Sequence, residues 1–360
     1  MKENLGFATE SNTPSYFAAS NSGRGFICYF DKIFTKNRFD KIYIIKGGPG
    51  TGKSSLLKAM RDAAISKGYE CEGILCSSDP SSYDGVTIKS CNRSIALLDG
   101  TSPHTRDTEA PGAFDEIIDL GQFWNSKVLE NSRERIIALT QKKSEAYRCA
   151  YSLLRSAEEY ASCKRSLLCR CIDEEKLSRY VSRILSFFKA DTKKRAPEYK
   201  LKNAISAEGY TSLPIYTVED GTHFSVCGSH GASFVFFDLL QKKSEEKELN
   251  VTLSPDPLSP DILDAMALPD HKVFFHQTES SSNVTCKTIN TERFLVESTL
   301  REIKPMLRML SRLEKSSLDS ALEMLSKAKL LHLTLEDIYI GAMDFEKKEK
   351  LQKDLIQKIL

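Results

Sequence analysis

A glycine-rich segment near residue 50 constrains the fold of this 360-residue chain more than any other feature. It follows a short apolar run at 42–45, precedes a segment of helical character from Ser54, and reads Gly47, Gly48, Pro49, Gly50, Thr51, Gly52, Lys53 and Ser54. Because glycines carry no side chain, such a loop can close around an anion with its backbone N–H groups pointing inward. The sequence therefore predicts a strand, a phosphate-binding loop of the Walker A type and a helix, in this order.

Different residues of this loop are expected to bind the phosphates and the metal ion. Lys53 would reach the β- and γ-phosphates of a nucleoside triphosphate, and the hydroxyl of Ser54, followed by Ser55, would bind Mg²⁺ at the start of the helix. Asp99 ends the apolar run 95–98, as the carboxylate of a Walker B strand does, although it also has the position of a turn cap. We expect ATP and Mg²⁺ as ligands, with Lys53 and Asp99 as catalytic residues. The absence of an Asn-Lys-x-Asp pattern favours ATP over GTP.

Composition and termini narrow the class of protein. The chain has 41% hydrophobic and 28% charged residues and contains no apolar stretch long enough to cross a bilayer, so we expect no membrane association. The first four residues, Met-Lys-Glu-Asn, lack the apolar core of a secretory signal, which predicts a cytoplasmic location. The ten cysteines form no Cys-x-x-Cys pair, and we interpret them as reduced thiols rather than metal ligands.

The second half of the chain repeats the pattern of the first. Residues 76–84 align without a gap with 253–261, and this alignment matches Asp79 with Asp256 and Asp84 with Asp261. Further matches, at a constant spacing, pair Ala150, Leu154, Ala157 and Asp173 with Ala321, Leu325, Ala328 and Asp344. The repeat predicts two tandem α/β domains built like P-loop NTPases, each a parallel sheet that continues into a helical arm. We place these domains at 1–200 and 201–360, with arms at about 126–200 and 292–360.

The repeat also places a second, degenerate loop at 228–235. There Phe234 replaces Lys53, Val235 replaces Ser54, and His276 replaces Asp99 at the end of the later strand. An aromatic ring offers no charge to a triphosphate and tends to fill the space. We therefore expect one working site in the first half and a structural or regulatory second half; a second pocket that still binds a ligand weakly is the alternative.

Five further residues are candidates for auxiliary roles. Asp79 and Asp84 follow the second strand, where a carboxylate can orient or deprotonate a phosphate acceptor, but turn or cap roles explain them equally well. His104 and Arg106 follow Asp99 closely enough to contact the γ-phosphate, and Glu116 is a candidate to orient water. Exposed loop or cap positions are the alternative for these three.

Positive charge is concentrated in one segment. The net charge is only +2, but residues 127–202 hold 19 Lys and Arg against 10 Asp and Glu. This segment, with Lys142, Lys143, Lys164, Arg165 and 193–195, could bind nucleic acid or another acidic partner; a solvated basic face is the alternative.

Together the motifs at 47–54, 77–80, 98–104 and 111–116 resemble those of a little-characterised bacterial family of tandem P-loop ATPases. The stretch Asp99-Gly100-Thr101-Ser102-Pro103-His104 points to this family in particular. The resemblance implies nucleotide binding and ATP hydrolysis, carried by residues 47–54 and Asp99. The second half of similar proteins often keeps a recognisable phosphate loop, and this chain departs from it at Ser233, Phe234 and Val235.

Three functions remain open at this point. The first is Mg²⁺-dependent ATP hydrolysis at a single N-terminal site. The second is a kinase that transfers the γ-phosphoryl group to a small molecule or nucleoside, with Asp79 or Asp84 at the acceptor. The third is a nucleotide-sensing module with little turnover that binds nucleic acid or protein in one nucleotide state.

Overall fold

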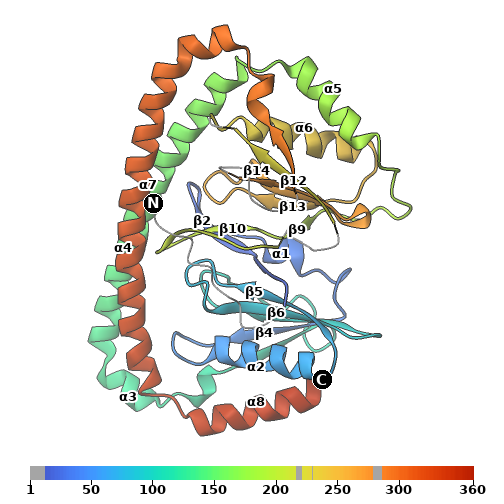
Figure 1. The fold of residues 1–360 in the computed structure, drawn as a ribbon. Coiled ribbons are helices and arrows are strands. Elements are labelled where there is room, and N and C mark those ends of the chain that lie inside the picture. Colours follow the sequence, from blue (N-terminus) through green and yellow to red (C-terminus); the bar gives the residue numbers. More distant parts are fainter. Residues whose placement is uncertain (1–12, 216–220, 229, 279–285) are drawn as a thin grey trace.

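The structure, a computed structural model, describes residues 13–215, 221–228, 230–278 and 286–360. Two six-stranded sheets lie one above the other, and two long helices run along one side of both, as Figure 1 shows. The chain thus has an α/β architecture with one sheet from each half. None of the described helices is long and apolar enough to cross a membrane.

The first sheet is mixed rather than parallel. In spatial order it consists of β1 (Ser15–Phe17), β5 (Glu70–Leu75), β6 (Tyr83–Lys89), β7 (Ser94–Asp99), β4 (Lys41–Lys46) and β8 (Asp115–Asp119). Strand β6 runs antiparallel to both neighbours, and the other pairs are parallel. The expectation of a parallel sheet was wrong here because the β5–β6 and β6–β7 connections are too short for the crossover that parallel pairing needs.

The second sheet repeats this arrangement. Its spatial order is β9 (Glu198–Tyr199), β13 (Thr252–Pro255), β14 (Leu263–Leu268), β15 (Val273–Gln277), β12 (Thr222–Cys227) and β16 (Lys287–Asn290). Strand β14 is antiparallel to both neighbours, as β6 is in the first sheet. The two sheets have the same order and the same directions, as a duplicated chain predicts. Because β9 pairs with β13, the second sheet begins just before residue 200.

Backbone hydrogen bonds correct the alignment of the two halves after β5 and β13. In the first half the backbone N–H of Cys76 donates to the carbonyl oxygen of Ser82, and the N–H of Ser82 donates to the carbonyl oxygen of Asp79. In the second half the N–H of Asp256 donates to the carbonyl oxygen of Ile262, and the N–H of Ile262 donates to the carbonyl oxygen of Ser259. The counterpart of Asp79 is therefore Ser259, and Asp84 corresponds to Asp264. The gapless alignment was three residues out of register because the two Asp-Pro pairs occupy different positions of the same turn.

The strand register makes a second correction. Asp99 lies beside Ile45 on β4, and the residue beside the matching Val226 of β12 is Gln277. Gln277, and not His276, is thus the counterpart of Asp99. The conclusion that the second half has lost this carboxylate is unchanged.

Each sheet is covered on one face by a helix that follows the loop. Helix α2 (Lys53–Ser66) packs on the first sheet and α6 (Ser233–Glu246) on the second. Alternation along β4 sends Tyr43 and Ile45 toward α2, whereas Ile42 and Ile44 face the opposite side, where short α1 (Phe30–Ile33) lies. Between the sheets lie two hairpins, β2–β3 (Ala19–Ser22, Gly25–Cys28) and β10–β11 (Asn203–Ser206, Gly209–Ser212).

The two arms are antiparallel helices that pack along each other. The first arm contains α3 (Ser126–Asn131), α4 (Arg133–Cys169) and α5 (Glu174–Leu185). The second arm contains α7 (Glu297–Ile340) and α8 (Phe345–Ile359). Three short 3₁₀ turns lie outside these helices: η1 (Gly121–Phe123), η2 (Pro269–His271) and η3 (Thr291–Phe294). The matched residues of the two arms share one core: Ala150, Leu154, Ala157, Ala321 and Leu325. Asp173 and Asp344 each cap the helix that follows, through the N–H of Lys176 and Lys347. The repeat therefore extends into the arms.

The last helix of each arm packs on the sheet of the other half. Val181 and Leu177 of α5 lie in the core of the second sheet with Phe236, and Leu355 and Ile359 of α8 lie in the core of the first sheet under α2. Figure 1 shows α5 beside α6 at one end and α8 beside α2 at the other. Residues 1–200 and 201–360 are thus interlocked, and each sheet with its covering helices, which we call a lobe, draws on both halves.

Candidate functional site

The loop at 47–52 joins the end of β4 to the start of α2 and needs its glycines. Gly50 and Gly52 have φ values of 69° and 79°, in the left-handed region that favours glycine, and Gly52 is the N-cap of α2. A Cβ atom at Gly50 would lie 2.8 Å from the carbonyl oxygen of Glu336. Both the backbone conformation and the close approach of a neighbouring helix therefore require glycine at this position.

Lys53 lies inside the curve of this loop. Its Nζ donates to the carbonyl oxygens of Gly47 at 3.0 Å and Gly48 at 2.8 Å, and lies 3.6 Å from Oδ2 of Asp99. The side chains of Lys53 and Asp99 are only 13% and 14% exposed. Parallel strands β4 and β7 are neighbours, so their carboxyl ends bring the two residues together. The structure thus joins the two residues that the sequence nominated as catalytic.

Asp99 performs two tasks at once. Its Oδ1 accepts hydrogen bonds from the N–H and the hydroxyl of Thr101, at 2.8 and 2.5 Å, and so caps the turn after β7. Its Oδ2 faces Lys53. The metal-binding and turn-cap interpretations of this carboxylate are therefore compatible, since each uses a different oxygen.

The donors near the loop fit a magnesium ion better than a transition metal. Ser54 and Asp99 supply hydroxyl and carboxylate oxygens, the ligands that Mg²⁺ prefers. The part of the chain that the structure describes has no cluster of three or more His, Cys, Asp or Glu able to hold a metal. Mg²⁺ usually takes one or two protein ligands and completes its shell with water and phosphate oxygens. The Ser54 hydroxyl also accepts a hydrogen bond from the N–H of Tyr83 at 2.9 Å.

The second arm covers the loop, which the sequence did not reveal. Gly48 lies against the rings of Trp124 and Tyr339, since a Cβ there would be 3.0 and 3.4 Å from them. From α8, Lys348 Nζ donates to the hydroxyl of Ser55 at 2.8 Å. Residues almost 300 positions apart therefore meet at the start of α2. No local pattern signals this contact, because it follows from the exchange of helices between the lobes.

A chain of polar side chains lies over the loop from α7 to α4. Nε2 of His332 is 3.6 Å from Oε1 of Glu336, and Nδ1 of His332 is 3.5 Å from Nζ of Lys143. Burial raises the pKa of Glu336, opposed by the Gly50 N–H and by the charge of Lys53. Burial, with the charges of Lys143 and Lys53, lowers the pKa of His332 to about 4. The imidazole is therefore neutral at pH 7, and burial also lowers the pKa of Lys143.

Asp79 and Asp84 have different surroundings, since Asp79 lies in the connection between β5 and β6 and Asp84 lies on β6. Oδ1 of Asp79 is 3.4 Å from Nζ of Lys329 on α7, which keeps Asp79 beside the arm that covers the loop. Asp84 instead faces the side of α1, because its neighbour Tyr83 points toward Arg61 of α2. There its Oδ2 lies 2.9 Å from Nε2 of buried His104. Of the two candidate acceptor residues, only Asp79 remains near the loop.

His104, Arg106 and Glu116 have structural roles, which corrects the expectation for all three. His104 stacks on Phe30 on the face of the sheet opposite α2. Arg106 is buried and donates to the carbonyl oxygens of Phe30 and Phe34, which close α1. Glu116 forms an ion pair with Lys358 at the end of α8, at 2.7 Å. These three side chains contact α1 and α8 rather than the loop at 47–52, and sequence spacing alone does not give that direction.

The His104–Asp84 pair predicts a pH dependence of stability. Although burial lowers the pKa of His104, the charge of Asp84 and its hydrogen bond outweigh this and hold the pKa well above 6.5. A raised pKa in the folded state contributes stability that is fully present below about pH 6.5 and is lost as the pH rises through the folded value. The free energy of unfolding should therefore fall as the pH rises above 6.5.

Denaturant titrations between pH 6 and 9 check this. The Asp84→Asn variant should lose most of the slope, whereas Asp79→Asn, which changes a carboxylate away from His104, should keep it. Identical slopes in the wild type and Asp84→Asn would contradict the assignment.

The second loop carries apolar packing where the first carries charge. Phe234 packs against Leu168 near the end of α4 and Leu300 near the start of α7. Val235 packs against the core of the second lobe. Oε1 of Gln277 accepts a hydrogen bond from the Ser233 hydroxyl at 2.9 Å. Ser229 lies outside the described residues. At the positions of Lys53 and Asp99 the second lobe thus has a ring and an amide, neither of which carries charge.

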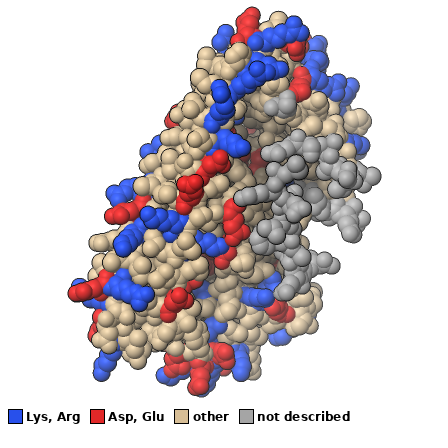
Figure 2. All heavy atoms as spheres, turned by 60° about the vertical axis from the view of Figure 1, so that its left-hand side comes forward, with Lys and Arg blue, Asp and Glu red and all other residues tan. Residues whose placement is uncertain are grey.

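Part of the positive charge of the basic segment is paired with carboxylates of the same chain. Lys164 pairs with Glu314, Arg165 with Glu158, and Arg195 with Asp270. Figure 2 shows positive and negative side chains interspersed over the side of the molecule that the arms form. The excess charge counted in the sequence therefore does not form a continuous basic face on this side.

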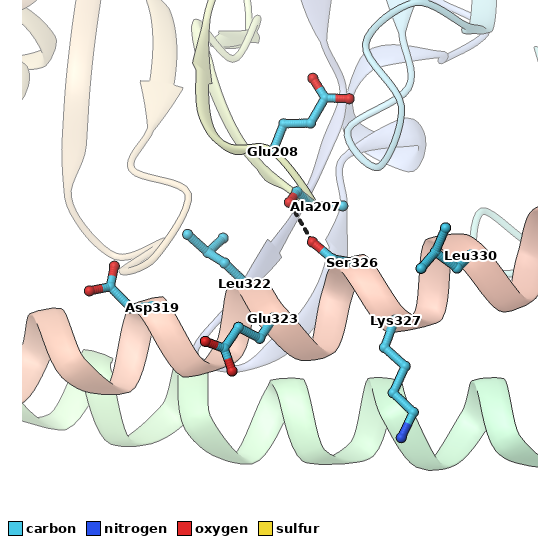
Figure 3. A pocket seen from close by; sticks show the side chains of 8 residues that line it. All are labelled: Ala207, Glu208, Asp319, Leu322, Glu323, Ser326, Lys327 and Leu330. Carbon is cyan, nitrogen blue, oxygen red and sulfur yellow. Dashed lines mark hydrogen bonds between the residues drawn. The ribbon is translucent and has the colours of Figure 1, made fainter. Parts of the chain in front are cut away.

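A groove lies on α7, away from the loop. It has a volume of about 490 Å³ between α7 and the tip of the β10–β11 hairpin, and Figure 3 shows its lining residues, Ala207, Glu208, Asp319, Leu322, Glu323, Ser326, Lys327 and Leu330. The Ser326 hydroxyl donates to the carbonyl oxygen of Ala207 at 2.8 Å and holds the hairpin to the helix. None of the loop residues contributes to this groove.

Comparison of the chain with models of protein families, with curated proteins and with solved structures found no match.

Proposed function

We propose that the chain binds Mg²⁺–ATP at residues 47–55 and hydrolyses it at this single site. One observation carries the proposal: Lys53 Nζ is enclosed by the carbonyl oxygens of a glycine loop and faces the Asp99 carboxylate of the adjacent strand. The carbonyl and carboxylate oxygens compensate the charge of Lys53. A triphosphate offers a stronger negative charge, and Lys53 would exchange the carbonyl oxygens for phosphate oxygens.

The chemistry expected of this site depends on positioning and charge. Mg²⁺ would be held by Ser54 and Asp99 and would supply charge neutralisation of the phosphates when bound. Lys53 stabilises the negative charge that develops as the γ-phosphoryl group leaves, and the loop amides orient the chain of phosphates. Trp124, Tyr339 and Lys348 contact the loop, whose residues 47–54 are buried or half-buried, and this partial burial strengthens each of these interactions.

A nucleotide-sensing module with little turnover is the second candidate. It is favoured by the contact between the loop and the second arm, since Lys348 and Tyr339 belong to the other half of the sequence. Nucleotide binding at the loop would then change the position of helices that also contact the second lobe. The kinase alternative depends on Asp79 alone, because Asp84 is buried against His104.

Phosphate release by the purified protein separates these functions. We would measure it with ATP and with GTP, alone and with pooled metabolites or nucleic acids. Hydrolysis of ATP by the protein alone supports the first proposal, and consumption that requires an added acceptor and yields a phosphorylated product indicates a kinase. Tight binding without turnover indicates the sensing module, and neither binding nor release at millimolar nucleotide refutes all three.

A further inference from the structure

A thiol, an imidazole and a carboxylate meet on the face of the first sheet opposite α2. Sγ of Cys28, the last residue of β3, lies 3.6 Å from Nδ1 of His104. Nε2 of the same ring lies 2.9 Å from Oδ2 of Asp84. A thiol beside an imidazole that a carboxylate orients is the arrangement that activates cysteine as a nucleophile. The nucleotide site at 47–55 uses none of these three residues, which we call the thiol cluster.

The ring of His104 is held in a fixed orientation. It stacks on Phe30 with ring centroids 5.0 Å apart and an interplanar angle of 15°, and Phe26 meets it edge-on at 4.9 Å. His104 and Asp84 are each only 6% exposed. Because each ring nitrogen also has a partner, a turn of the ring would break two contacts at once. Nδ1 therefore stays directed at the sulfur atom.

The imidazole places a positive charge beside the sulfur atom. Although burial lowers the pKa of His104, the charge of Asp84 and its hydrogen bond outweigh this and hold the pKa well above 6.5. At pH 7 both ring nitrogens are therefore protonated, and Nδ1–H can donate to Cys28. A cation at this distance favours the thiolate, which is the nucleophilic form of cysteine. Burial instead raises the pKa of Cys71 and of Cys76 to about 11, so these two thiols keep their protons.

The second half builds the same part of the fold with other chemistry. Ser212 ends β11 as Cys28 ends β3, in hairpins of the same register. Asp264, the counterpart of the carboxylate in the cluster, accepts hydrogen bonds at 2.6 Å from a hydroxyl and from a side-chain amide, which are neutral groups. The fold by itself therefore does not require a thiol and a charged imidazole at this place.

We propose that Cys28 is a redox-reactive thiol whose substrate is a small peroxide, with His104 stabilising its thiolate and Asp84 as a positioning residue. The sulfur electron pair attacks one peroxide oxygen, the O–O bond breaks, and the hydroxide that leaves takes up a proton to form water. Sulfur is thereby oxidised to the sulfenic acid, and the peroxide is reduced. The half-buried position of Cys28, beside a ring enclosed by Phe26 and Phe30, favours a small electrophile. This inference does not depend on nucleotide binding.

Brief treatment of the folded protein with hydrogen peroxide at pH 7 tests the proposal. Sulfenic acid is trapped with dimedone as the protein is unfolded, and is located by mass spectrometry of peptides. Cys91, exposed in the β6–β7 turn, is the reference within the same sample. Because an ordinary thiol is only a few per cent thiolate at this pH, Cys28 should be oxidised at least about tenfold faster than Cys91. Exposure alone gives the reverse order, and equal or slower oxidation of Cys28 would overturn the proposal.

Two carboxylate variants test the activation of the thiol. Asp84→Asn removes the charge that keeps the imidazole protonated, and the oxidation of Cys28 should slow about tenfold. Asp79→Asn, which changes a carboxylate away from His104, should leave this rate within about twofold of the wild type. A purely structural effect of Asp84→Asn would loosen the site and speed oxidation. An unchanged or faster rate for Cys28 in folded Asp84→Asn would therefore contradict the proposal.

Cys71 reports whether each variant is folded. It is 8% exposed, so a folded protein should show no dimedone adduct on this residue. If Asp84→Asn exposes Cys71, His104→Gln is measured in its place, and the same slowing of Cys28 oxidation is expected because the cation is lost. Wild-type rates in a folded His104→Gln variant would refute the role of the imidazole.

Discussion

Replacing Lys53 with alanine is expected to lower ATP turnover by about 10²-fold or more, equivalent to roughly 3 kcal/mol of transition-state stabilisation. Lys53 is the cation that the loop encloses, with Nζ 2.8 and 3.0 Å from two loop carbonyl oxygens and 3.6 Å from Asp99. Lys348 approaches the loop from α8, where its Nζ contacts the Ser55 hydroxyl and lies 3.5 Å from the Cβ position of Gly52, but Lys53 is the cation that faces Asp99. Loss of the Lys53 side chain would therefore remove the positive charge that the proposal assigns to the β- and γ-phosphates.

Steady-state phosphate release measures this effect. Lys67→Ala is the matched control, because Lys67 is exposed at the far end of the same helix and should leave turnover within about twofold. Thermal denaturation of both variants separates a catalytic loss from unfolding. A Lys53→Ala variant with wild-type turnover would refute the role proposed for the lysine.

Truncation of one side chain near the C-terminus is expected to destabilise the N-terminal lobe. Leu355 of α8 is 6% exposed and packs in the core that contains Leu57 and Met60 of α2. Leu355→Ala removes buried methyl groups and leaves a cavity, which should lower the free energy of unfolding by about 2–5 kcal/mol. The effect should reach the proposed nucleotide site, because α8 also holds Lys348 against Ser55.

Denaturant unfolding with and without Mg²⁺–ATP checks this result. Leu330→Ala is the control of identical chemistry, since Leu330 is 66% exposed on α7, and it should change stability by about 0.5 kcal/mol or less. Equal effects of the two substitutions would mean that α8 does not belong to the core of the first lobe, and the interlocked arrangement would be contradicted.

The loop and its strand partner were predictable because their signals are local. Glycines at Gly50 and Gly52 require particular backbone angles, and an apolar run that ends in Asp99 specifies a buried strand with a carboxylate at its end. The arms were also predictable, because Ala150, Leu154 and Ala157 recur at the same spacing in α7 and pack in one core. In each case the residues that carry the signal also make the interaction.

Other features depend on contacts that no short segment encodes. The antiparallel direction of β6 follows from the short connections to its neighbours. The correspondence of Asp79 with Ser259 follows from the hydrogen bonds of the two turns and not from identical residues in the sequence. The face of the sheet toward which a side chain points was the hardest feature to predict from the sequence. Asp84 and His104 follow the expected strands, yet they point to the face opposite the loop and bind each other.

The exchange of α5 and α8 could not be read from the sequence. Both helices are amphipathic, which predicts that they pack on something, but the pattern does not say on which sheet. The contact of Lys348 with Ser55 follows from the placement of α8, and the contact of Glu336 with Gly50 follows from the end of α7 that leads into it. The residues that the structure adds to the site therefore come from positions that the sequence assigned to helical arms.

The stoichiometry of nucleotide binding tests the account most directly. Titration of the wild-type chain with Mg²⁺–ATP in a calorimeter should give one equivalent per chain, because Lys53 and Asp99 carry charge in the first lobe where Phe234 and Gln277 stand in the second. The same titration of Lys53→Ala should show binding weakened by at least tenfold. Two equivalents per chain, or no heat with millimolar nucleotide, would contradict the single-site account.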